Sequence, residues 1–189
     1  TKMEKHLFIT LKSNDDFISD LNLINSYNIK NPYAQISILT FKDNSKITEI
    51  YPASFNFEYI DKSKIKTIIA SRLFCDAFAI NTFMANLGTA INTNWDISHD
   101  LTGTDLSGYI HAAIKSENKN GVLLNKNKMA SYPSDWIAIT NDLLNPTDDH
   151  FFNPTMINQS LLNIENISEV DFKVAPSLSH MANTNFSRI

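Results

Sequence analysis

The feature that most constrains the fold of this sequence is a long stretch of helical periodicity from Asp61 to Leu87. Apolar residues recur there every three or four positions, which is the spacing of one face of an α-helix. Asp61 or Ser63 can cap its start, and Gly88 suits its end. The pattern predicts one long helix at the centre of the core, with four side chains buried on its apolar face: Ile69, Leu73, Ile80 and Met84.

The sixty residues before this helix are rich in strand patterns. Short runs of β-branched and aromatic residues predict strands, and the acids after Asn14 are typical of a helix start. The expected order is one strand, one helix and three further strands, at residues 5–12, 14–27, 34–41, 47–51 and 55–60. That order indicates the α+β class.

The pattern weakens after Gly88. The segment 92–103 has the composition of a polar loop. Residues 104–116 fit either a helix or a strand that enters a hairpin turn at Asn120-Gly121, and helix is slightly favoured. Ser134 and Pro154 are candidate starts of two further helices.

The whole chain, 1–189, is therefore expected to be a single α+β domain. Its predicted core is a mostly antiparallel sheet packed on a long central helix. The parts are a strand-rich segment 1–60, the core helix 61–87, a mixed, helix-rich segment 104–175 and an irregular tail 176–189.

Composition excludes several classes of function. The chain has 189 residues, a net charge of −4 and a pI near 5.7, which argues against nucleic-acid binding. Cys75 is the only cysteine, so no disulfide can form within the chain. The longest uncharged run, from Ala77 to Trp95, holds four Asn residues that would lose hydration in a bilayer, so no membrane span is expected. We therefore predict a cytoplasmic protein, and the bias towards Asn, Ile and Lys indicates an AT-rich bacterium or virus.

Most recognisable catalytic motifs are absent. The four glycines, at 88, 103, 108 and 121, stand alone, so there is no glycine-rich phosphate loop. There is also no nucleophile elbow and no zinc-binding pattern. The sequence accordingly assigns no catalytic residue, no cofactor and no metal.

Two loose groups of residues remain as candidate sites. The first lies within 96–111, where acids and imidazoles close in sequence could form an acid–base pair. Its members are Asp96, His99, Asp100, Asp105, Tyr109 and His111.

The second group is Tyr132 and Trp136, four positions apart, with Asp149 further on. The two rings could line a ligand pocket, and Asp149 could accept a hydrogen bond from an amide. Together with the preceding Gly108-Tyr109, this segment resembles the ligand-binding stretch of LuxR-type acyl-homoserine-lactone receptors. It departs from that family at Thr140 and His150, where the family has Tyr and Pro.

Because neither group forms a complete catalytic constellation, the sequence favours a non-catalytic interaction or accessory protein that acts through protein–protein contacts. The balance is against an enzyme. One alternative is a small-molecule-binding sensor domain that uses Tyr132, Trp136 and Asp149. The other is a hydrolase or transferase that uses the 96–111 group.

Overall fold

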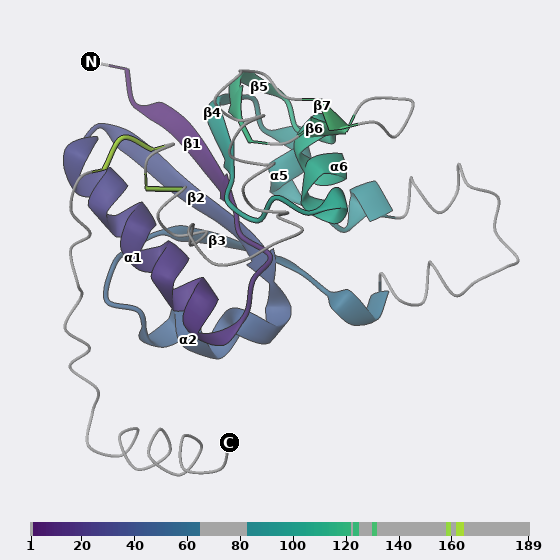
Figure 1. Cartoon of the computed structure of the whole chain (residues 1–189), viewed down its shortest axis with the longest axis horizontal. Helices are drawn as coiled ribbons and strands as arrows, with labels where there is room; N and C mark the ends of the chain where they lie inside the picture. The colour runs from purple at the N-terminus through teal and green to yellow at the C-terminus, as the bar shows by residue number, and fades with distance from the viewer. Residues whose placement is uncertain are drawn as a thin grey trace, which may run out of the picture.

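The computed structural model describes residues 2–64, 83–121, 123–124, 130–131, 158–159 and 162–164. Its centre is a five-stranded sheet in which every neighbouring pair of strands is parallel. The strand order is β3-β2-β1-β4-β5 (Figure 1). The bounds are Glu4–Ile9 for β1, Ala34–Phe41 for β2, Asn56–Ile60 for β3, Trp95–Asp100 for β4 and Ser116–Asn120 for β5.

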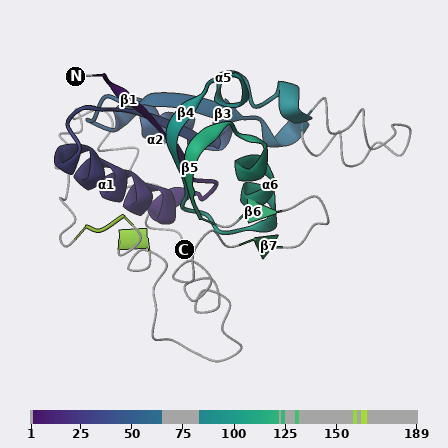
Figure 2. The same cartoon turned by 90° about the horizontal axis from the view of Figure 1, so that it is seen from above.

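Helices cover both faces of the sheet (Figures 1 and 2). One face carries α1 (Asn14–Lys30) and α2 (Ser45–Ile50), the latter entered through a short 3-10 helix at Lys42–Asn44. The other face carries α5 (Thr89–Asn92) and α6 (Asp105–Ala113). A small antiparallel pair, β6 (Leu123–Leu124) with β7 (Ala130–Ser131), follows the sheet.

The alternation of side chains along β1 divides the core in two. Phe8 points towards α1 and packs with Phe17, Leu21 and Ile24. Leu7 and Ile9 point the other way, into a cluster that includes Ile110 of α6. Successive side chains of a strand point to opposite faces of the sheet, and both faces are covered here, so the core has two layers.

The parallel sheet contradicts the predicted fold class. The expected α+β domain with a mostly antiparallel sheet is wrong, and the observed architecture is a Rossmann-like α/β fold. Residues 47–51 were expected to be a strand, but α2 occupies Ser45–Ile50. That helix turns the connection from β2 to β3 into a crossover, and strands joined by a crossover run parallel.

The second cause of the error is the polar segment 92–103, which was expected to be a loop. It contains β4, which lies beside β1 in the middle of the sheet. The predictions for β1, α1, β2 and β3 are confirmed, as is the helix in 104–116, which is α6.

Most of the predicted helix 61–87 lies outside the described residues, and so do Ile69, Leu73, Ile80 and Cys75. At its far end, Leu87 is buried and Met84 packs half-buried against the core. Within the part of the chain that can be described, no helix is both long and apolar enough to cross a bilayer. The division of the chain into segments stays a prediction.

Candidate functional site

The topology marks one edge of the sheet as the place to look for a site. The chain runs from β1 outwards to β2 and β3, and later returns to the other side of β1 to form β4 and β5. In open α/β sheets, ligands bind at the carboxyl ends of the strands where the strand order reverses in this way. Here that point lies between β1 and β4.

The first buried carboxylate at this edge belongs to Asp20 of α1. The Thr10 hydroxyl, at the end of β1, donates to Asp20 Oδ2 over 2.7 Å, and Lys12 Nζ donates to Oδ1 over 3.0 Å. Burial raises the pKa of Asp20, while the Lys12 charge and the Thr10 hydrogen bond oppose that rise. Asp20 thus fixes the direction in which the chain leaves β1.

The second buried carboxylate is Asp100, the last residue of β4. Its Oδ1 accepts from the backbone N–H groups of Thr102, at 2.9 Å, and Gly103, at 3.3 Å, and its Oδ2 accepts from the Ser107 hydroxyl at 2.8 Å. Burial raises the pKa of Asp100 to about 6, against the lowering effect of these hydrogen bonds. Asp100 therefore organises the turn that leads from β4 into α6.

Gly121 explains how this carboxylate is enclosed. It follows β5 with a φ of +127°, and a Cβ there would lie 2.7 Å from the Asp100 Cβ. Glycine permits both the backbone conformation and the close approach.

Hydrogen bonds join the two turns to each other. The Leu11 N–H donates to the Thr102 hydroxyl at 2.8 Å, and the Leu101 N–H donates to the Ile9 carbonyl at 2.9 Å. The Asn158 amide donates to the Leu101 carbonyl at 3.0 Å, so a distant segment is attached at the same place. We call Thr10, Lys12, Asp20, Asp100, Thr102 and Ser107 the carboxyl-edge cluster.

The groups available to a ligand at this edge come from the start of α1. Ser13 to Asp16 are all exposed, and Asn14 has a φ of 53°, so the chain turns sharply into the helix. Asp16 lies one helical turn before Asp20, close enough for its charge to raise the pKa of Asp20. Asp16 thus shares a helix face with the residue bound to the end of β1.

The start of α6 is closed by its own side chains. Thr104 and Ser107 form a reciprocal capping box, in which each side chain bonds the backbone of the other residue. Ser107 also holds Asp100. This helix terminus therefore supports the carboxyl-edge cluster, while the acids at the start of α1 remain exposed.

The structure separates the 96–111 group predicted from sequence. Asp96 lies at the opposite end of β4, where it pairs with Lys2 and accepts from the Lys5 N–H. His111 meets the Ser98 hydroxyl at 2.8 Å, and Tyr109 is exposed. Among the described residues no group of three metal-ligating side chains occurs. Asp100 ends β4 at the carboxyl edge, and Asp105 is the first residue of α6, which follows it.

His99 belongs to an aromatic cluster under α1. Its ring stacks on Phe8 with centroids 4.6 Å apart and meets Tyr27 edge-on. Burial, reinforced by the charges of His6 and His111, lowers the pKa of His99 to about 3. A neutral, enclosed imidazole of this kind serves packing.

Tyr132, Trp136 and Asp149 lie outside the described residues, so the predicted ligand pocket there remains a prediction. The Gly108-Tyr109 pair, which the resemblance to LuxR-type receptors needs in a strand, lies in α6. Sequence reasoning did not single out Asp16, because acids at a helix start are ordinarily solvated, or Asp20, which lies further along the predicted helix. The available signal was that the helix carrying both acids follows a buried strand.

Comparison with known proteins finds matches to the fold alone. No family model matches the sequence, and no curated protein matches it. Solved structures of glycosyltransferases do match.

One is a glycosyl transferase family 9 protein from Veillonella parvula DSM 2008, with a TM-score of 0.64 and 13% identity over 99% of this chain and 50% of that one. Another is the E. coli heptosyltransferase WaaC with ADP, with a TM-score of 0.54 and 12% identity over 96% of this chain and 53% of that one. WaaC with ADP-2-deoxy-2-fluoro heptose gives a TM-score of 0.56 and 12% identity, over 95% and 54%. The chain thus spans about half the length of the structures it matches.

These matches replace the functional interpretation made from sequence. The expectation of a non-catalytic protein acting through protein–protein contacts is wrong, because the neighbours are sugar-transferring enzymes that share this Rossmann-like fold. They favour the alternative of a transferase. Identities this low establish the fold, and the reaction is a matter for proposal.

Proposed function

We propose that this chain is one Rossmann-like half of a glycosyltransferase and that it acts on the sugar acceptor. The observation that carries the proposal is the fold match over 99% of the chain, at a TM-score of 0.64. The placement of exposed carboxylates at the strand-order reversal supports it, because that is where α/β folds bind their substrates.

Sugar transfer needs a base that takes the proton from the attacking hydroxyl of the acceptor. Asp16 suits this role because it is exposed and lies on the same helix face as Asp20. Asp15 is the preceding residue in the helix, about 100° around its axis, and does not share that face. The buried contacts of Asp20 with Thr10 and Lys12 hold the first turn of α1 in place.

The same acids argue against donor binding at this helix start. Helix N-termini attract phosphate, but Asp15 and Asp16 place two negative charges at this one. A nucleotide diphosphate would be repelled there, whereas an uncharged acceptor hydroxyl would not. This charge pattern supports the acceptor role. A small-molecule substrate and a cytoplasmic location belong to the same proposal.

The test is a transfer assay on the full-length natural protein with ADP-, UDP- and GDP-linked sugars and a panel of saccharide acceptors. We expect release of nucleoside diphosphate that depends on the acceptor. Asp16→Asn should lower kcat by about 100-fold or more, as loss of a general base does. Asp43→Asn, at an exposed acid paired with Lys62, is the matched control and should retain the rate.

Two results would contradict the proposal. One is the absence of acceptor-dependent turnover with every donor. The other is an Asp16→Asn variant that transfers sugar as fast as the Asp43→Asn control.

A further inference from the structure

A second polar surface lies at the other end of the same sheet. On the face covered by α5 and α6, three strands change from polar to apolar along their length. In β1, Lys5 precedes Leu7 and Ile9 on this face, and in β2, Gln35 and Ser37 precede Leu39. β3 follows the same order, with Asn56 and Glu58 before Ile60. Parallel strands covered on both faces are normally apolar throughout, so this reversal needs a reason.

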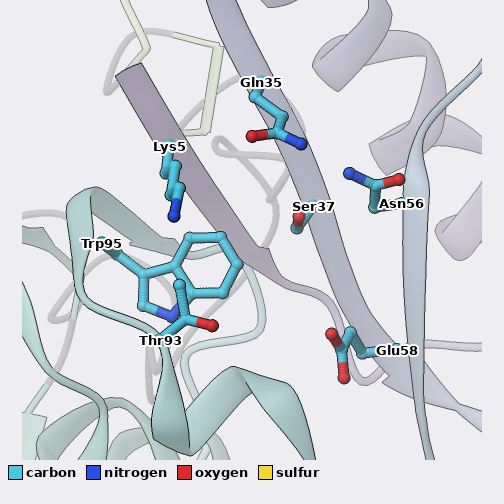
Figure 3. A pocket seen from close by; sticks show the side chains of 7 residues that line it. All are labelled: Lys5, Gln35, Ser37, Asn56, Glu58, Thr93 and Trp95. Carbon is cyan, nitrogen blue, oxygen red and sulfur yellow. The ribbon is translucent and has the colours of Figure 1, made fainter. Parts of the chain in front are cut away.

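The polar ends of these strands line a pocket of about 350 Å³ (Figure 3). That volume lies at the lower end of the range for small-molecule sites, roughly 300–1,000 Å³. Besides Thr93, the lining residues are Lys5, Gln35, Ser37, Asn56, Glu58 and Trp95, and we call this site the amino-edge pocket.

Four of the polar side chains that line the amino-edge pocket make no hydrogen bond within the part of the chain that the structure describes. They offer an ammonium group, two carboxamides and a hydroxyl, from Lys5, Gln35, Asn56 and Ser37. Ser37 is nonetheless 95% covered, since its exposed fraction is only 5%. Donors and acceptors that share a hollow without pairing are available to a ligand.

Two further residues of the amino-edge pocket, Glu58 and Trp95, are held in place by hydrogen bonds to α5. Glu58 accepts a hydrogen bond from the Thr89 hydroxyl and from the backbone N–H groups of Thr89 and Ala90. The indole N–H of Trp95 donates to the Ala90 carbonyl at 2.9 Å. Figure 3 shows the six-membered ring of Trp95 turned towards the hollow, with Glu58 at the far end from Lys5. One carboxylate is therefore held in place before any ligand arrives, and the Trp95 ring, only 5% exposed, forms part of the pocket wall.

We propose that the amino-edge pocket binds an uncharged saccharide unit. A sugar ring carries hydroxyl groups that each donate and accept, which matches alternating carboxamide, hydroxyl, ammonium and carboxylate groups. Its C–H groups can contact the part of the Trp95 ring that lines the pocket. The cation and the carboxylate at opposite ends balance in charge, which disfavours a phosphate and an apolar ligand alike.

This site is separate from the one in the proposed function. Lys5 lies near the start of β1 and Thr10 directly follows its end, so the two are about 16 Å apart at roughly 3.3 Å per residue. A saccharide held here would lie at the end of the sheet opposite Asp16. The proposal therefore extends the molecule's sugar recognition to a second position and does not depend on the acceptor role of the carboxyl edge.

The experiment is a titration of the ¹⁵N-labelled chain with methyl glucoside, methyl galactoside, mannose, N-acetylglucosamine, maltose and cellobiose, followed by two-dimensional NMR. We expect at least one probe to give saturable shifts at the amides of Lys5, Gln35 and Asn56 and at the Trp95 indole. The double variant Gln35→Ala, Asn56→Ala should weaken that binding by about 10-fold or more. Asn118→Ala, at an exposed carboxamide on the edge strand β5, is the matched control and should bind as the parent does.

The proposal is overturned if no probe produces saturable shifts at these residues, or if the double variant binds as tightly as the control. It is also overturned if ADP, titrated in parallel, shifts the same residues more strongly than every saccharide. The titration measures binding at the amino-edge pocket without any sugar transfer, so failure of this site is distinguishable from failure of the proposed transfer reaction.

Discussion

The two ends of this sheet differ in whether their polar side chains are hydrogen-bonded. At the carboxyl end, the buried carboxylates of Asp20 and Asp100 accept from neighbours on several elements. At the amino end, Gln35, Ser37 and Asn56 share a hollow without hydrogen bonds inside the described part of the chain.

The difference separates polar groups that hold the fold from polar groups that are open to a ligand. A buried donor or acceptor without a partner costs about 1–3 kcal/mol, whereas a paired one is close to neutral or favourable. The carboxyl-edge cluster therefore positions the start of α1 at little cost. In the amino-edge pocket, the side chains of Lys5, Gln35 and Asn56 are exposed, so water can satisfy them and a ligand can replace that water.

The largest expected effect comes from opening the enclosure of Asp100. Gly121→Ala places a Cβ 2.7 Å from the Asp100 Cβ, at a φ of +127° that L-residues rarely adopt. Strain and the forced shift together should lower the free energy of unfolding by about 3 kcal/mol. Urea denaturation measures the loss.

Gly88→Ala is the matched control for this change. Its φ is +55°, and the nearest atom to a new Cβ is the flexible end of Glu58, at 3.5 Å. Backbone strain alone remains there, so the expected loss is smaller, about 1–2 kcal/mol. Equal losses in the two variants would show that Asp100 is not tightly enclosed.

The next effect concerns His99 of β4. Unlike the buried carboxylates at the carboxyl end of the sheet, it has a buried polar atom without a partner among the described residues. Its Nδ1 meets the Asn120 amide at 3.2 Å, but its buried Nε2 has no partner among the described residues. With its pKa lowered to about 3, His99 stays neutral in the fold while it charges in the unfolded chain below about pH 6.5. The contribution of neutral His99 to the free energy of unfolding is therefore full above that pH and falls as the solution becomes more acid.

Acidification from pH 7 to pH 5 should cost about 2 kcal/mol through this residue. His99→Phe keeps the stack on Phe8 and should remove that loss, as urea melts at the two pH values would show. Asp100 has the opposite effect, because its pKa is raised to about 6 in the folded chain. As the pH drops below that value, Asp100 binds a proton in the folded chain before it does in the unfolded chain, and this stabilises the fold. An unchanged pH dependence in His99→Phe would contradict a neutral buried imidazole.

The smallest effects give the most direct comparison, because both lie on β2. The Thr40 hydroxyl accepts from the Asn44 amide at 2.9 Å, so Thr40→Val should cost about 1 kcal/mol. Ser37→Val lines the amino-edge pocket and should stabilise the fold by about 0.5–1 kcal/mol, since it buries apolar surface where no hydrogen bond is lost. The two changes in melting temperature should have opposite signs. Two losses of equal size would mean that Ser37 is as well paired as Thr40.

Sequence patterns predicted the elements whose stability is local or apolar. The alternation in Ala34–Phe41 and the helical spacing after Asn14 were sufficient for β2 and α1. They failed for β4, in which Asp96, Ser98 and Asp100 look like a loop. Those side chains are satisfied by Lys5, His111 and Ser107, and such non-local partners are invisible in the order of residues.

The site was predictable to the same degree. Asp100 and His111 were identified as chemistry-bearing residues, but the sequence could not show that they serve separate structural roles. Asp16 and Asp20 were interpreted only as helix-start and helix residues. Their importance depends on the strand-order reversal, which requires the pairing of β1 with β4 across some 90 residues.

That pairing also has a consequence for how the protein is made. On a ribosome, β1, β2 and β3 emerge early and can pair, but β4 follows only after a long intervening stretch of chain. Until then one side of β1 presents the unpaired amides and carbonyls of an apolar strand, the kind of edge to which strands of other molecules add. Nascent chains are therefore most prone to aggregation during this interval, and slower synthesis between β3 and β4 should lower the soluble yield.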